Sequence, residues 1–183
     1  MNAKVELAHY ANLWRDGDEA AGDRLFRELE SDLRQIAEAR LAGERNFSLS
    51  AGELVSEAVV RLAGLERIEW KSEAHILALA STIMRQVLLD HIRRKNSQKR
   101  RHDVVTLCTD VAQAEPDFEL IALNMAMEEL AEIDPGRASI VEMRYFGGMS
   151  LASIGEVLGL SEATVKRRWA VTRAWLQDRL ESS

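Results

Sequence analysis

The segment Ser150–Leu180 restricts the possible folds most, because its pattern predicts two helices joined by a tight turn. Three apolar side chains share one face of the short first helix: Leu151, Ile154 and Leu158. Gly159 can adopt the left-handed backbone conformation that ends a helix, and Ser161 can cap the start of the next one. The second helix is expected to bury one stripe of side chains: Val165, Trp169, Thr172, Leu176 and Leu180.

Basic residues of the second helix lie away from this stripe, at Lys166, Arg167 and Arg173. A short helix, a glycine turn and a second helix with exposed basic residues are typical of a helix-turn-helix, which places its second helix in the DNA major groove. A plain helical hairpin with a solvated basic face would show the same periodicity. The small residue Gly155, where the two helices must approach each other, favours the helix-turn-helix.

The charge is unevenly distributed along the chain. The formal net charge is −6, but segment 84–102 holds seven Lys and Arg against one acid. Segment 161–183 holds five against three, whereas 103–160 holds two against eleven. Two basic segments on an acidic body indicate that the protein grips DNA at two places, while the remainder faces protein or solvent.

Upstream of the helix-turn-helix, the sequence predicts further helices. Ser50 and Glu53 form a capping box at the start of one of them. The longest helix is expected from Glu73 to about Lys99, with an apolar first half and a basic second half. The basic half can present its end to a phosphate backbone, although a solvated charge run is the alternative.

The domain organisation of the chain follows from these predicted helices and from the stretch 102–116. This stretch is polar and weakly periodic, and we interpret it as a flexible acidic linker. We therefore expect an all-α fold of two small helical domains, residues 1–101 and residues 117–183. In the second domain, Asp134 and Pro135 are predicted to start a helix that ends at Gly147-Gly148.

The composition excludes several function classes. No apolar run approaches the length that spans a bilayer, and the N-terminus lacks the pattern of a secretory signal, so we expect a cytoplasmic protein. The single Cys108 cannot form an internal disulfide. We expect neither catalysis nor a cofactor or metal, because there is no Gly-rich phosphate loop and the four histidines lack metal-ligand spacing: His9, His75, His91 and His102.

With these segments placed, nearly the whole chain resembles the extracytoplasmic-function (ECF) type of bacterial RNA polymerase sigma factor, in the sigma-70 family. ELVSEAVVRL resembles its region 2.2, and SEAHILALASTIMRQVLLDHIRRKNSQKRR resembles regions 2.3 and 2.4. RASIVEMRYFGGMSLASIGEVLGLSEATVKRRWAVTRAWL resembles region 4, so the first predicted domain would correspond to region 2 and the second to region 4. The resemblance implies a protein that binds core RNA polymerase and directs promoter-specific transcription initiation through the −10 and −35 elements.

The resemblance also implies roles for individual residues. Contacts with the β′ clamp of polymerase would come from Leu54, Val55, Glu57 and Arg61. Contacts with the −10 element would come from Arg67, Trp70, Lys71, Arg85, Arg93, Arg94 and Lys95. Contacts with the −35 element would come from Glu162, Thr164, Lys166, Arg167, Arg168 and Arg173. The β flap of polymerase is a further expected partner, and family members often have an anti-sigma protein.

One departure from the family and one alternative function stay open. Many relatives carry a basic side chain at the position of Ala170 or Val171, so the −35 contacts here are expected to be fewer or shifted toward 166–168. The alternative is a helix-turn-helix regulator that binds DNA as a dimer without entering polymerase. A single helix-turn-helix usually needs to dimerise to bind well, because the dimer occupies two half-sites.

Overall fold

The computed structural model describes residues 3–41, 49–65, 71–102 and 116–181, and all regular elements in these ranges are helical. The N-terminal half contains α1 (Ala3–Arg15), α2 (Glu19–Leu41), α3 (Ala51–Ala63) and α4 (Glu73–His102). The C-terminal half contains α5 (Pro116–Ile133), α6 (Pro135–Val141), the π-helical turn η2 (Glu142–Phe146), α7 (Leu151–Leu158) and α8 (Glu162–Glu181). The predicted all-α fold is confirmed.

The helix boundaries follow the predicted turn and cap chemistry. The Ser50 hydroxyl accepts a hydrogen bond from the Glu53 N–H, and the Glu53 carboxylate accepts one from the Ser50 N–H at 2.8 Å, so the predicted capping box is confirmed. The Asp134 carboxylate accepts from the N–H of Arg137 with proline at the first helical position, also as predicted. The following helix does end at Gly147-Gly148, but its last turn is the π-helical η2, which the sequence pattern did not predict.

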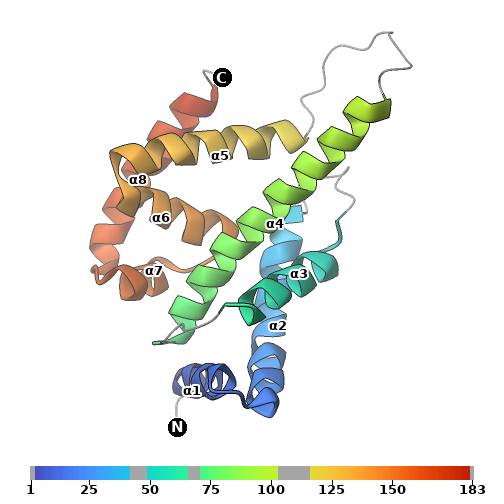
Figure 1. Cartoon of the computed structure of the whole chain (residues 1–183). Helices are drawn as coiled ribbons and strands as arrows, with labels where there is room; N and C mark the ends of the chain where they lie inside the picture. The colour runs from blue at the N-terminus through green and yellow to red at the C-terminus, as the bar shows by residue number, and fades with distance from the viewer. Residues whose placement is uncertain (1–2, 42–48, 66–70, 103–115, 182–183) are drawn as a thin grey trace.

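The long helix α4 is the part of the N-terminal half that borders the C-terminal half (Figure 1). On one side it packs against α1 and α3, and α2 packs in turn against those two helices, burying Leu25, Leu29, Leu54 and Ile92 among others. On its other side lie the helices of the C-terminal half, α5 to α8 (Figure 1). One continuous cluster of buried side chains includes Leu29 from α2 and Leu176 from α8, so the two halves share a hydrophobic core.

The predicted stripe of α8 is confirmed for Val165, Thr172 and Leu176, which are buried. Trp169 is half-buried and packs against both hydrophobic clusters. The prediction is wrong for Leu180, which is 38% exposed because it lies in the last turn of α8, beyond the last side chain that the core covers. The predicted linker, residues 102–116, falls almost entirely outside the described residues.

Candidate functional site

The helix-turn-helix is formed by α7 and α8. Gly159 ends α7 with a φ of 65°, the left-handed conformation predicted for it. The turn passes so close to α7 that a Cβ atom on Gly155 would lie 2.6 Å from the carbonyl oxygen of Leu160. The Thr164 N–H donates to the Ser161 hydroxyl at 3.3 Å, which caps α8. Close packing at Gly155 fixes the angle between the helices and distinguishes this unit from a loose hairpin.

The solvent-facing side of α8 carries most of the residues predicted to contact the −35 element. Glu162, Lys166, Arg167 and Arg173 are exposed, and Thr164 is half-buried beside Ser161. Arg168 differs, because it is half-buried and its Nη1 atom would lie 3.2 Å from a Cβ atom added to Gly136, at the start of α6. The accessible charge is therefore concentrated at Lys166 and Arg167 in the early turns of α8.

The basic second half of α4 carries exposed cationic side chains. The side chain of Arg93 is 71% exposed and lies 3.9 Å from Asp90, Arg94 is exposed, and Lys95 is half-buried. Lys71, just before α4, is also exposed. Two further residues of the predicted −10 set, Arg67 and Trp70, lie outside the described residues.

Arg85 departs from the rest of the predicted −10 set. Its Nε donates to the Glu142 carboxylate at 2.7 Å, and its Nη1 donates to the Asn124 side-chain oxygen at 2.7 Å. The Arg85 and Glu142 side chains are only 20% and 18% exposed. The C-terminal half thus covers Arg85, so in this conformation the predicted contact of Arg85 with DNA needs correction.

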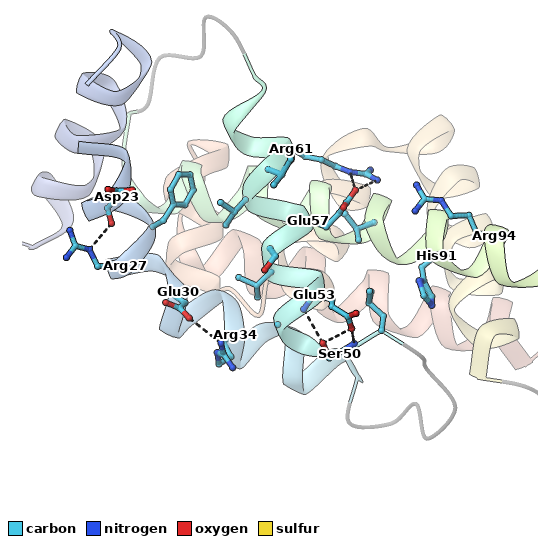
Figure 2. A pocket seen from close by; sticks show the side chains of 18 residues that line it. Asp23, Arg27, Glu30, Arg34, Ser50, Glu53, Glu57, Arg61, His91 and Arg94 are labelled. Atoms are coloured by element: carbon cyan, nitrogen blue, oxygen red, sulfur yellow. Dashed lines mark hydrogen bonds and ion pairs between the residues drawn. The ribbon is translucent and has the colours of Figure 1, made fainter. Parts of the chain in front are cut away.

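A groove lies on the N-terminal half, between α2, α3 and α4 (Figure 2). Its volume is about 1320 Å³, larger than the pockets of about 300 to 1,000 Å³ that hold small molecules. Val55 and Val59 are among its apolar lining residues, and charged side chains of both signs also line it. These dimensions suit an element of another macromolecule better than a small ligand.

Three of the four residues predicted to contact the β′ clamp line this groove: Val55, Glu57 and Arg61. The fourth, Leu54, is fully buried in the core, so its predicted direct contact is corrected to support of the groove from beneath. Arg61 donates to Asp90 of α4 at 2.9 Å and to Glu57 at 3.1 Å. These hydrogen bonds, first the one to Asp90, raise the pKa of Arg61 despite its partial burial. The pairing joins α3 to α4 along the groove.

The start of α3 adds a fixed negative charge at the groove. Hydrogen bonds from the Ser50 N–H and hydroxyl lower the pKa of the Glu53 carboxyl group. Glu53 and Ser50 both line the groove, where Figure 2 shows their hydrogen bonds. Glu53 is therefore ionised at neutral pH where it lines the groove.

Sequence reasoning missed the α2 side of the groove and an exposed apolar residue of α3. Arg27, Glu30 and Arg34 of α2 lie along the rim, and no local motif marks them because helical charge runs usually face only solvent. Val60 is 68% exposed and lines the groove. Its position on the polar side of an otherwise amphipathic helix was a usable signal, since an exposed apolar side chain beside charged ones often marks an interface.

Neither a metal centre nor a membrane-spanning helix is found in the described ranges. Those residues contain no group of three or more His, Cys, Asp or Glu side chains placed to hold a metal ion. None of the described helices combines the length and apolar character that crossing a membrane requires.

Comparisons with known proteins cover both halves of the chain. The model of a family described as "ECF sigma factor" matches residues 4–182. The "ECF RNA polymerase sigma factor SigM" of Mycobacterium tuberculosis (strain ATCC 35801 / TMC 107 / Erdman) is 29% identical to the chain over 180 residues, which is 96% of this chain and 82% of that relative. Because the family match includes the groove, the basic end of α4 and the helix-turn-helix, the chain belongs to the ECF sigma factor family.

Proposed function

We propose that this sigma factor, which directs core RNA polymerase to promoters, divides its task among three surfaces. The outer face of α8 reads the −35 element, the basic end of α4 engages the −10 element, and the groove between α2, α3 and α4 holds the β′ clamp. The observation that carries the proposal is the joint exposure of Lys166 and Arg167 on the second helix of a tightly packed helix-turn-helix.

The −35 contacts are supported by the chemistry of the exposed α8 side chains. An arginine can donate two hydrogen bonds to the N7 and O6 atoms of guanine in the major groove, whereas lysine mainly neutralises phosphate or contacts a single base. Arg167 is fully available for such a contact, while Arg168 leans toward α6. Since Ala170 and Val171 add no charge, we place the main −35 contacts at Lys166 and Arg167, with Arg173 nearer the backbone.

The −10 contacts are supported by the cluster of cations on α4. Arg93, Arg94 and Lys95 can neutralise phosphates near the segment of DNA that must open, and holding an unpaired base in a pocket lowers the free energy of melting. Arg67 and Trp70, which precede α4 in the sequence, are proposed to take part, with the Trp70 ring as a stacking surface. RNA synthesis itself belongs to the polymerase, since a sigma factor is an initiation factor without catalysis of its own.

The clamp contact is supported by the groove. An apolar strip formed by Val55, Val59 and Val60 is flanked by Glu57 and Arg61, the pattern that receives an amphipathic helix with charged edges. A helical coiled-coil element of the β′ clamp fits this chemistry.

The β flap and an anti-sigma protein are further proposed partners, acting in the cytoplasm where polymerase and promoter meet. The exposed apolar side chains of Met125 and Ile133 on α5 offer the C-terminal half a contact suited to the flap.

In vitro transcription with core polymerase and a genomic promoter library tests the proposal. Start sites that appear only when the protein is added, and that share −10 and −35 sequences, are the expected result. A protein that dimerises on DNA but neither co-elutes with core polymerase nor creates start sites would instead support the dimeric regulator.

A further inference from the structure

A small pocket is formed by residues of α2, η2 and α8, and none of them belongs to the surfaces proposed above. Its volume is about 300 Å³, at the lower end of the range for pockets that hold small molecules. The described residues that line it are Arg40, Arg144, Tyr145, Gly148 and Trp169. They include two arginines and two aromatic rings but no Asp or Glu, although the chain has 30 acidic residues against 24 Lys and Arg. This lining favours an anionic ligand.

Arg40 brings an unsatisfied hydrogen-bond donor to this pocket. Its guanidinium carbon lies 4.5 Å from the centre of the Tyr145 ring, within the range of a cation–π contact. Its Nε atom is buried and has no hydrogen-bond partner among the described residues. The Nε atom of Arg137 also lacks a hydrogen bond, but it lies 3.2 Å from a carboxylate oxygen of Asp134, which compensates its charge. A buried donor without a partner is costly, so an acceptor bound beside Arg40 would be stabilising.

Arg144 supplies the second cation of the pocket. Its Nη1 atom donates to the Met149 carbonyl oxygen at 2.6 Å, which holds the guanidinium in one orientation. A guanidinium has five N–H donors, so this hydrogen bond leaves others for a ligand. Gly148, with a φ of 58°, adds backbone but no side chain to the pocket wall. Two arginines, one from α2 and one from η2, can therefore contact one anion.

Charge and shape together indicate the class of anion. A phosphate monoester carries about 1.5 to 2 negative charges at neutral pH and offers three strong acceptor oxygens. It therefore matches two guanidinium groups better than a carboxylate with a single charge does. The rings of Tyr145 and Trp169 suit a planar group, since nucleobases stack on aromatic side chains. The small volume of the pocket admits a small molecule and excludes a DNA duplex.

We propose that this pocket binds a small phosphate monoester with a planar ring, of which a nucleoside monophosphate is the simplest example. Arg40 and Arg144 hold the phosphate, while the rings of Tyr145 and Trp169 contact the planar group. The site is separate from promoter recognition, because Trp169 packs against the core clusters whereas the −35 contacts are proposed at exposed residues of α8. The pocket thus gives the protein a ligand besides DNA and polymerase.

Isothermal titration calorimetry of the full chain with AMP tests the class of ligand. We expect one AMP to bind per chain with a dissociation constant below about 1 mM. Adenosine, which lacks the phosphate, should bind at least about tenfold more weakly, because it forms no charge-assisted hydrogen bonds. Inorganic phosphate should compete with AMP but bind more weakly, because it has no ring. Equal affinity for AMP and either of these compounds, or no saturation by AMP, would overturn the proposal.

Two matched substitutions on α2 test whether AMP binds in the pocket. Arg40→Gln should weaken AMP binding at least about tenfold, because it removes one guanidinium from the phosphate. Arg24→Gln is the control, since Arg24 also lies over a tyrosine ring, at 5.9 Å from the centre of Tyr10, but lines neither the pocket nor the groove. The control protein should bind AMP as the unmodified protein does. Equal affinities of the two variants would overturn the proposal.

Folding and binding at the DNA-contacting face are checked separately. Circular dichroism verifies that each variant is helical, and AMP should raise the Tm of the unmodified and Arg24→Gln proteins. Arg144→Gln is a second pocket variant, and it should also bind AMP at least about tenfold more weakly; full binding by a folded Arg144→Gln protein would contradict the site. An excess of duplex DNA should leave AMP bound. Displacement of AMP by DNA would place AMP on the DNA-contacting face and overturn the proposal.

Discussion

At the scale of single residues, Arg167 carries the sharpest expectation for promoter recognition. Its side chain is exposed on α8, so Arg167→Ala should remove a −35 contact without disturbing the core. If the guanidinium reads a base, −35-dependent initiation should weaken by about 1 to 3 kcal/mol, and less if it touches only phosphate. Run-off transcription measures the effect, with Arg179→Ala in the last turns of α8 as the matched loss of charge. Equal effects from the two variants would contradict a specific role for Arg167.

A glycine substitution tests the packing of the helix-turn-helix. A methyl group on Gly155 would lie 2.6 Å from the Leu160 carbonyl oxygen, so Gly155→Ala should destabilise the protein by about 1 to 3 kcal/mol. Gly52→Ala is the matched control, because the added methyl group meets only the Ser50 hydroxyl at 4.0 Å in a helical position. The control should be neutral or stabilising by about 0.4 to 1 kcal/mol. Urea denaturation compares the two, and a stable Gly155→Ala protein would refute the close approach.

At the scale of elements, local chemistry allowed most helix boundaries to be predicted. Ser50, Asp134 and Gly159 each act within three or four residues of the position they determine, so their caps could be inferred before any packing was known. The π-helical turn η2 could not be predicted in this way. It lies at a close contact between elements that are distant in the sequence, because Gly147, the residue after η2, packs directly against Ser81 of α4. A distortion imposed by a distant element leaves no periodicity of its own.

The capping box of α3 links this element to pH. Ser50→Ala should lower the free energy of unfolding by about 1 kcal/mol, because it removes the N-cap of α3. Hydrogen bonding lowers the pKa of Glu53 in the folded protein. The ionised Glu53 side chain therefore stabilises the fold fully above the ordinary pKa of 4.5, and this stabilisation is lost as the pH falls through the lowered pKa of the folded state. The free energy of unfolding of Glu53→Gln should therefore differ most from that of the unmodified protein at neutral pH, and the two should converge in acid. Parallel unfolding curves from pH 7 to pH 3 check this, and a constant difference would contradict it.

At the scale of the whole molecule, the sequence predicted the components of the site better than their arrangement. The basic faces of α4 and α8 follow from charge runs, and the family resemblance assigns them to promoter elements. The covering of Arg85 by Glu142 could not be predicted, because 57 residues separate the partners and a row of cations suggests only exposure. Likewise, the resemblance placed Leu54 at the clamp, whereas the structure buries this side chain in the core.

The groove makes a prediction about assembly with polymerase. Glu57 and Arg61 form an ion pair on its wall at 3.1 Å, so the exchange Glu57→Arg with Arg61→Glu keeps a pair within α3 but inverts the charges that a partner meets. The exchange also replaces the contact between Arg61 and Asp90 by a repulsion, so folding must be verified by thermal unfolding.

We expect binding to core polymerase to weaken at least about tenfold, because like charges then oppose each other across a desolvating interface. The control is the exchange Arg15→Asp with Asp16→Arg, an ion pair at 2.9 Å at the end of α1 and outside the groove, which should preserve binding. Co-elution with core polymerase at several salt concentrations measures both variants. Unchanged affinity for a folded Glu57 and Arg61 exchange would place the clamp contact elsewhere on the chain, whereas loss of binding in both variants would indicate a general charge effect.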